Sequence, residues 1–197
     1  MKTIGLTGGV GMGKSTAASL LRSRGFPVID TDDVARKLVE PGQPALAEIR
    51  QLFGSDILGP DGRLRRGELA RLVFSNSAKR GQLEGILHPR IRQVWKAQRD
   101  SWCAEGGPIA VVVIPLLFET DAHTELDATI CVACSSSTQL ERLKARGWSP
   151  EHIYQRIHAQ WPVEKKMNLA NYVIWSEGSV DIHAAQLDLL LRRLQVS

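Results

Sequence analysis

A glycine-rich run close to the N-terminus holds the residue types that bind phosphate. It reads Gly8-Gly9-Val10-Gly11-Met12-Gly13-Lys14-Ser15-Thr16 and matches the pattern G-x-x-x-x-G-K-[ST]. The run follows an apolar segment, residues 3–6, and opens a segment with helical spacing. Glycines allow such a loop to turn its backbone N–H groups toward an anion at the start of a helix. The pattern predicts a phosphate-binding loop (P-loop); the alternative is a glycine-rich turn that only joins strand to helix.

Two side chains of this loop indicate how the phosphates would be used. Lys14 is expected to reach the β- and γ-phosphates of ATP, and the Ser15 hydroxyl is expected to bind Mg²⁺. The loop predicts nucleotide binding but leaves open what is done with the γ-phosphate.

Carboxylates follow the second predicted strand, residues 27–29. The segment Asp30-Thr31-Asp32-Asp33 leaves the carboxyl end of that strand, the edge at which open parallel sheets bind ligands. One of these carboxylates is expected to take the acceptor's proton or to hold the waters of a metal ion, and Asp32 is our first choice for the metal's second carboxylate. The alternative is that Asp30 and Thr31 cap the next helix and that the following acids offset its dipole.

The third apolar segment, residues 109–114, lacks the final Asp that often binds the metal in nucleotide-binding folds. It continues into Pro115-Leu116-Leu117-Phe118-Glu119. Glu119 is interpreted as a helix cap or a loop residue as readily as a carboxylate near the metal.

The order of these segments predicts an α/β fold. Five apolar segments, 3–6, 27–29, 109–114, 128–132 and 172–175, alternate with helical patterns, as in a parallel sheet with helices on both faces. The expected architecture is the three-layer sandwich of P-loop NTPases with a five-stranded parallel sheet. Its first helix should run from about Gly13 to Gly25, and its last should begin near Ser179, a plausible N-cap.

Two stretches exceed this minimal pattern. Residues 31–105 predict a helical insertion for substrate binding, with breaks at residues 41–42, 59–62 and 88–89. Residues 137–169 predict a short helical lid, here called the lid segment, with a second helix restarting at Ser149-Pro150. The remaining residues, 1–30, 106–136 and 170–197, form the predicted nucleotide-binding core.

Arg142 and Arg146 lie one helical turn apart in the lid segment. This spacing predicts two guanidinium groups on one helix face, either stabilising a transferred phosphoryl group or forming a solvated face.

Composition narrows the functional class. The chain has 197 residues, 43% hydrophobic and 23% charged, with a net charge of +4 and charges of both signs interleaved. No aromatic platform or zinc spacing favours a nucleic-acid partner, and no apolar run is long enough to span a bilayer. A cytoplasmic protein is expected.

Cys131 and Cys134 invite a metal or redox interpretation, but residues three apart on a strand face opposite ways, which favours buried thiols.

The chain as a whole resembles the dephospho-CoA kinase family. The resemblance rests on five pieces in order: the P-loop, Val28-Ile29-Asp30-Thr31-Asp32, Asp61-Gly62-Arg63-Leu64 with Arg66, Leu83 to Pro89, and Pro115 to Glu119. Each piece is short, but the series is specific.

The resemblance implies transfer of the ATP γ-phosphoryl group to the 3′-hydroxyl of dephospho-CoA. It implies Asp32 as general base, Lys14, Arg142 and Arg146 as catalytic cations, and Asp32, Arg66 and His88 as substrate-binding residues. From the residues alone, His88 is interpreted as a helix-breaking turn residue before Pro89 in preference to a proton shuttle. Near the fifth strand the family usually shows Ala-Asp-x-Val-Ile-x-Asn, whereas this chain has Asn171 and Ser176 at the two polar positions.

Three other functions remain open at the level of sequence. A P-loop kinase for a nucleoside monophosphate or a shikimate-like acceptor would share the same phosphate chemistry. A GTPase switch would account for Asp56-Ile57-Leu58-Gly59, but that tetrad follows no apolar strand and no Asn-Lys-x-Asp motif occurs. A nucleic-acid-binding module would account only for the basic balance.

Overall fold

The computed structural model describes residues 1–74 and 76–196. Two serines lie outside the described residues: Ser75, within the predicted insertion, and Ser197, at the end of the predicted core. The chain divides into two compact units, residues 1–30 with 99–197 and residues 31–98. Each unit is described by itself.

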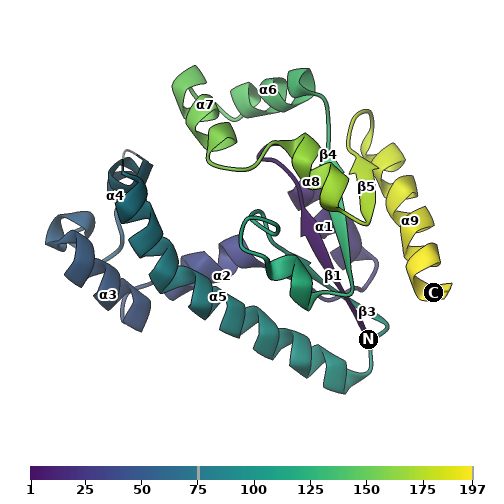
Figure 1. Cartoon of the computed structure of the whole chain (residues 1–197), viewed down its shortest axis with the longest axis horizontal. Helices are drawn as coiled ribbons and strands as arrows, with labels where there is room; N and C mark the ends of the chain where they lie inside the picture. The colour runs from purple at the N-terminus through teal and green to yellow at the C-terminus, as the bar shows by residue number, and fades with distance from the viewer. Residues whose placement is uncertain (75, 197) are drawn as a thin grey trace. The chain divides into compact units, whose positions relative to one another are not determined.

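A five-stranded parallel sheet forms the centre of the first unit (Figure 1). The strands run in the order β2-β3-β1-β4-β5, and the register pairs Ile4 of β1 with Val111 of β3 and Ala128 of β4. All five predicted strands are confirmed, with bounds β1 Lys2–Thr7, β2 Val28–Asp30, β3 Ile109–Val113, β4 Ala128–Ala133 and β5 Tyr172–Trp175.

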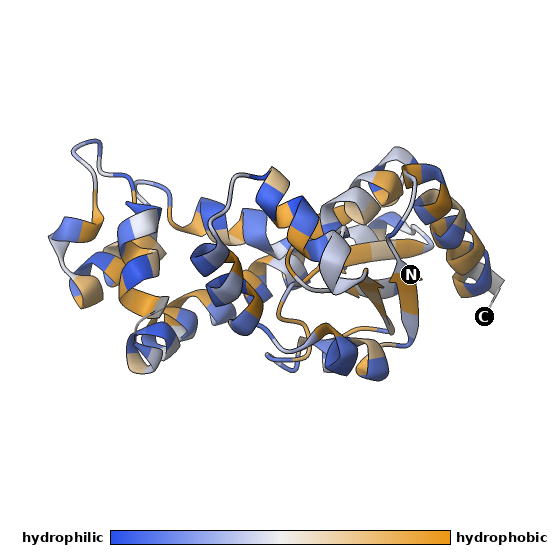
Figure 2. Ribbon diagram, turned by 90° about the horizontal axis from the view of Figure 1, so that it is seen from above, coloured by the Kyte–Doolittle hydropathy of each residue, from blue (hydrophilic) through white to orange (hydrophobic). Residues whose placement is uncertain are grey.

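Helices cover the sheet because its strands are apolar on both faces, as the orange strands of Figure 2 show. Helices α1 (Lys14–Ser23) and α9 (Val180–Val196) cover one face. On the other face, Leu117 and Leu126 pack against Gly5 of β1. A Cβ added to Gly5 would lie 2.6 Å from a Leu126 methyl group. The buried core combines Leu6 and β-branched residues of the strands with alanines and leucines of the two helices. Its members include Ile4, Leu6, Val111, Val113, Ile130, Val132, Ile174, Ala17, Ala18, Leu21, Leu187, Leu190, Leu191 and Leu194.

The second unit is helical, as predicted for the insertion. Helices α2 (Thr31–Leu38), α3 (Pro44–Phe53), η1 (Ser55–Ile57), α4 (Arg66–Phe74) and α5 (Ser77–Glu105) follow one another, with the last part of α5 in the first unit. Its apolar cluster consists of Val39, Leu46, Ile49, Ile57, Leu69 and Val73. The predicted breaks at 41–42 and 59–62 are confirmed, since no helix spans them.

The predicted break at His88–Pro89 is wrong, because α5 continues through Pro89. Proline removes one backbone donor and crowds the preceding turn, a cost of about 3 kcal/mol in a helix interior. The helix offsets this cost by packing: Leu83, Ile86 and Leu87 contact the apolar cluster before Pro89, and Trp95 is buried beyond it.

The lid segment belongs to the first unit and contains most of α6 (Ser136–Ala145), then α7 (Pro150–His158) and α8 (Val163–Leu169). Ser135 caps α6, accepting a hydrogen bond from the backbone N–H of Thr138, and Ser149 caps α7 with Pro150 at its first position. The predicted restart at Ser149-Pro150 is confirmed. A short helix, η2 (Ala122–Glu125), lies between β3 and β4.

Within residues 1–74 and 76–196, every helix is too short or too polar to cross a bilayer.

Candidate nucleotide-binding site

The P-loop joins the carboxyl end of β1 to the start of α1. Gly8, Gly11 and Gly13 have φ angles of 141°, 77° and 91°, a region that disfavours residues with a Cβ. At Gly8 an added Cβ would lie 2.1 Å from the carbonyl oxygen of Val132, so the loop also requires glycine for close packing against β4.

The start of α1 has the features of an anion-binding helix N-terminus. Its N-cap, Gly13, has no side chain to accept hydrogen bonds from the first turn, and no acidic residue lies there. A helix start without such a cap leaves N–H groups and a partial positive charge for a ligand.

Side-chain donors bind the carbonyl oxygens of the P-loop. The Lys14 ammonium donates to the oxygens of Gly8 at 2.7 Å and Gly9 at 2.8 Å. Gln139 Nε2 donates to the oxygen of Val10 at 2.7 Å, and Ser176 Oγ donates to that of Met12 at 2.9 Å. These contacts orient the carbonyl groups of the loop toward protein donors.

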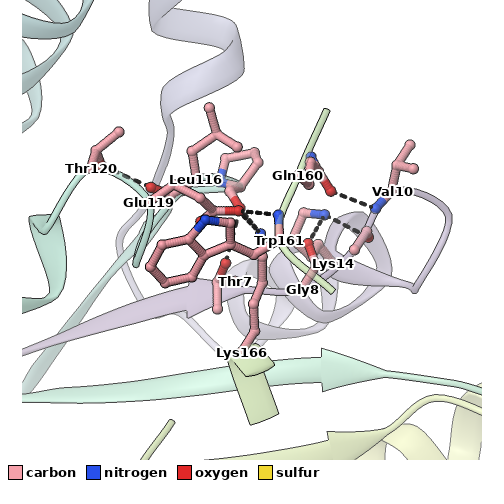
Figure 3. Close-up of polar contacts among 12 residues, drawn as sticks. Thr7, Gly8, Val10, Lys14, Leu116, Glu119, Thr120, Gln160, Trp161 and Lys166 are labelled. Atoms are coloured by element: carbon pink, nitrogen blue, oxygen red, sulfur yellow. Dashed lines mark hydrogen bonds and ion pairs between the residues drawn. The ribbon is translucent and has the colours of Figure 1, made fainter. Parts of the chain in front are cut away.

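The connection between α7 and α8 also contacts the loop (Figure 3). The backbone N–H of Val10 donates to Gln160 Oε1 at 3.1 Å. The next residue, Trp161, donates its backbone N–H to Glu119 Oε1 at 2.9 Å, and the same oxygen lies 2.7 Å from the ammonium of Lys166. Lys166 is fully buried and also donates to the oxygen of Pro115 at 2.7 Å.

Glu119 is therefore an ion-pair partner with a side chain only 13% exposed. Of the alternatives left open by the sequence, neither the cap nor the surface loop residue describes it. Because Lys166 carries a buried positive charge, removal of Glu119 would leave that charge uncompensated.

A pocket of about 250 Å³ lies beside the start of α1. It brings together P-loop residues, both lid arginines and the loop after β5. The residues that line it are Gly11, Gly13, Thr16, Arg142, Arg146, Ser176, Gly178, Ser179, Val180 and His183.

The Arg142 guanidinium is held at one wall of this pocket. It donates to Ser176 Oγ at 2.9 Å and to the Ser176 carbonyl oxygen at 2.5 Å. A Cβ added to Gly13 would lie 2.9 Å from Ser176 Oγ, so this serine packs directly on the P-loop. Arg146 follows the last residue of α6 and is exposed.

Asn171, the other departure from the family pattern, serves the sheet. Its Oδ1 accepts from Thr129 N at 2.8 Å and from Thr129 Oγ1 at 2.9 Å, which joins the start of β5 to β4. Of the two departures, only Ser176 lies at the pocket.

Two titratable groups near the pocket have shifted pKa values. Burial, and then the charge of Arg142, lowers the pKa of His183, so its imidazole is neutral at pH 7. Its Nε2 is buried without a hydrogen-bond partner among the described residues. Hydrogen bonds from Ser135, Trp175 and Thr138 lower the pKa of Glu177 to about 2.

Three further predicted residues, Asp32, Arg66 and His88, lie in the second unit. Asp32 is exposed in the first turn of α2, two residues after β2, while the adjacent Asp33 pairs with Arg36 at 2.7 Å. Arg66 begins α4 and donates to the carbonyl oxygen of Arg36 at 3.4 Å. His88 is half-buried inside α5, and burial lowers its pKa.

The residues present fit a magnesium ion that is bound together with a nucleotide. Among residues 1–74 and 76–196, no group of three or more acidic, His or Cys side chains could hold a metal. Ser15, an exposed hydroxyl in the first turn of α1, is the predicted ligand. Because Mg²⁺ keeps waters and binds substrate phosphates readily, one hydroxyl beside a triphosphate is an adequate protein contribution.

Sequence reasoning missed Gln139, Lys166 and the role of Gln160. Their contacts join segments more than 50 residues apart, such as Lys166 to Pro115 and Gln160 to Val10, and no local pattern predicts such pairs. Lys166 gives no signal in the sequence, because α8 is largely polar around it and a lysine in such a segment is ordinarily exposed.

The fold and the site together define a P-loop phosphotransferase. A parallel sheet, a glycine-rich loop with a lysine, an uncapped helix start and an arginine-bearing lid segment are the parts that phosphoryl transfer requires.

Comparison with known proteins specifies the family. The family model described as dephospho-CoA kinase matches residues 2–181. A relative from Anaeromyxobacter dehalogenans named dephospho-CoA kinase is 42% identical over 196 residues, covering 99% of this chain and 93% of the relative. A Bacillus cereus protein of the same name is 40% identical over 98% of this chain and 97% of its own. A crystal structure of a Thermus thermophilus protein has a TM-score of 0.83 at 36% identity, covering 98% of this chain and 97% of that one. The chain belongs to the dephospho-CoA kinase family.

Proposed function

We propose that this protein transfers the γ-phosphoryl group of MgATP to the ribose 3′-hydroxyl of dephospho-CoA, giving coenzyme A and ADP. The observation that carries the donor half is the start of α1, which has no side-chain cap and begins with Lys14. Family membership supports the acceptor half and the place of the reaction in coenzyme A synthesis.

The P-loop binds the triphosphate in this proposal. Its N–H groups and the start of α1 stabilise the negative charge, while Lys14 exchanges the oxygens of Gly8 and Gly9 for those of the β- and γ-phosphates. The Ser15 hydroxyl would hold the Mg²⁺, which would supply charge neutralisation at the phosphates.

Asp32 is proposed as the general base. It follows the carboxyl end of β2 by two residues, and its neighbour Asp33 is already paired with Arg36. The acceptor hydroxyl attacks the γ-phosphorus, its proton passes to the Asp32 carboxylate, and the bond between the γ-phosphorus and the bridging oxygen breaks to release ADP.

Arg142 and Arg146 are proposed to stabilise the transferred phosphoryl group. Both line the pocket beside the P-loop. For Arg142 this role requires that it exchange Ser176 for phosphate oxygens, because both donors of its fork are bound to that residue without ligand. An arginine that stayed on Ser176 would instead contact the nucleoside of ATP, and the neutral His183 in the same pocket suits that part of the ligand.

Arg66 and His88 are proposed to bind dephospho-CoA. Arg66 is an exposed cation at the start of α4, suited to a phosphate of the acceptor. The lowered pKa of His88 keeps its imidazole neutral at pH 7, which suits a hydrogen bond with an uncharged group.

A cytoplasmic location is also proposed. All three cysteines are free, Cys103 at the surface and Cys131 and Cys134 in the interior, as is ordinary in a reducing compartment.

An acceptor panel tests the proposed function. With MgATP, we expect kcat/KM for dephospho-CoA to exceed that for AMP or shikimate by about 10³-fold or more, because a site that hydrogen-bonds its substrate rejects molecules that leave those groups unpaired. ADP release measures the rates, and Lys14→Ala, which should lose turnover while remaining folded, gives the background. A preference for AMP or shikimate would contradict the proposal.

A further inference from the structure

The peptide group between Gly9 and Val10 is held at both ends. Its carbonyl oxygen, on Gly9, accepts from Lys14 at 2.8 Å, and its N–H, on Val10, donates to Gln160 at 3.1 Å. Figure 3 shows Gln160 and Lys14 beside Val10. One of the two residues that this peptide group joins is a glycine, so the peptide group can rotate at little steric cost. The two hydrogen bonds therefore fix its orientation.

Lys14 cannot hold this peptide throughout a catalytic cycle. In the proposed function its ammonium moves to the β- and γ-phosphates, and the Gly9 oxygen then loses a charge-assisted hydrogen bond. The Gln160 contact lies at the other end of the peptide and is made by a neutral side chain that need not move.

Gln160 is itself anchored. The adjacent Trp161 N–H binds Glu119, and Glu119 pairs with the buried Lys166, which in turn binds the backbone after β3. A buried ion pair of this kind gives a fixed position rather than large net stability. The backbone beside Gln160 is thus tied to the segment that follows β3.

We propose that Gln160 is a positioning residue for nucleotide binding, which keeps the Gly9–Val10 peptide in its orientation when Lys14 turns to the phosphates. Gln139 holds the following carbonyl, that of Val10, from α6 at 2.7 Å. Two amide side chains of the lid segment therefore bind the one non-glycine residue among loop positions 8–11. The inference rests on the proposed function for the role of Lys14.

The test compares Gln160→Met with the matched control Gln155→Met. Met has nearly the length of Gln but lacks the amide oxygen. Gln155 is an exposed glutamine of α7 whose side-chain amide donates to Glu151 at 3.4 Å. Affinities for ATP, ADP and adenosine are measured by calorimetry without any acceptor, so the result does not depend on which molecule is phosphorylated.

We expect Gln160→Met to raise the Kd for ATP and ADP about threefold to tenfold, the range for one lost hydrogen bond. The Kd for adenosine and the melting temperature should stay at wild-type values, because adenosine has no phosphate for the loop to bind, and Gln155→Met should leave all of them unchanged. Unchanged ATP affinity in Gln160→Met would overturn the proposal. So would a parallel loss for ATP and adenosine, since that result would assign Gln160 to general folding of the site.

Discussion

Lys14 donates to the carbonyl oxygens of Gly8 and Gly9, so in the proposed function nucleotide binding exchanges two hydrogen bonds of its ammonium for contacts with phosphate. This exchange explains how a cation remains half-buried beside a positively polarised helix start. The same logic holds at Arg142, whose partner is Ser176. Lys14 is held by two backbone oxygens, and Arg142 is held by the hydroxyl and the backbone oxygen of Ser176.

For Asp32 we predict that Asn substitution lowers kcat by about two to four orders of magnitude, the effect of losing a positioned base. The Kd for ATP should change much less, because the nucleotide is bound by the P-loop. Steady-state kinetics with both substrates, and calorimetry for ATP, measure the two quantities.

Asp33→Asn is the matched control, since Asp33 differs in position by one residue and pairs with Arg36 at the surface. It should retain nearly full kcat. An inactive Asp33→Asn beside an active Asp32→Asn would show that Asp33, and not Asp32, is the base. Full activity in both variants would mean that the two carboxylates serve only to cap the helix.

At the scale of elements, the lid segment and the loop after β5 meet at the pocket, and this meeting makes the roles of the arginines testable. We expect Arg142→Ala to lower kcat about 10²-fold or more, with Arg146→Ala similar or milder. Lys at either position should recover only part of the loss, because an ammonium cannot bridge two oxygens as a guanidinium does.

The comparison of kcat with KM for ATP decides between the two positions proposed for Arg142. A raised KM with unchanged kcat would mean that the arginine stays on Ser176 and binds the nucleoside. Melting temperatures of the variants should lie close to that of the wild type, because Arg146 is exposed and Arg142 is only half-buried.

Glu177 connects the loop after β5 to the start of α6, and its ionisation gives a prediction about pH. Its carboxylate accepts from Ser135, Thr138 and Trp175, which lowers its pKa from 4.5 to about 2. A group with a depressed pKa in the folded state stabilises the fold above its unfolded pKa and loses that contribution as pH falls through the folded pKa.

Glu177→Gln should therefore lower the melting temperature at pH 6 to 7. The difference from wild type should shrink as pH falls from 4.5 toward 2. Glu141→Gln, on the exposed face of α6, is the control and should show little difference at either pH. A difference for Glu177→Gln that stays constant over this range would contradict a role for the ionised carboxylate.

Most elements could be predicted from the sequence, because their signals are local. The strands at 109–113 and 172–175 follow from apolar composition, and Ser149-Pro150 marks a helix start by capping. The exception among the predicted helix breaks was Pro89. There the tertiary packing of Leu87 and Trp95 outweighs the tendency of proline to end a helix. Local patterns pointed to the P-loop and to Arg142 and Arg146, which line the pocket, but not to Lys166 or Gln139, since the contacts of those two residues depend on distant segments.

At the scale of the whole molecule, the two units carry different parts of the account. The first unit holds the P-loop, the pocket and both lid arginines, and the second holds Asp32, Arg66 and His88. The donor chemistry thus rests on contacts seen within one unit, while the choice of acceptor rests on the family to which the chain belongs.

The most direct measurement is the identity of the product formed from MgATP and dephospho-CoA. The account predicts a single product that is heavier by one phosphoryl group, with a ¹H–³¹P correlation from the new phosphate to the ribose H3′. Lys14→Ala should give none of it. A phosphate correlated with H2′, or ADP released with no phosphorylated dephospho-CoA, would contradict the account.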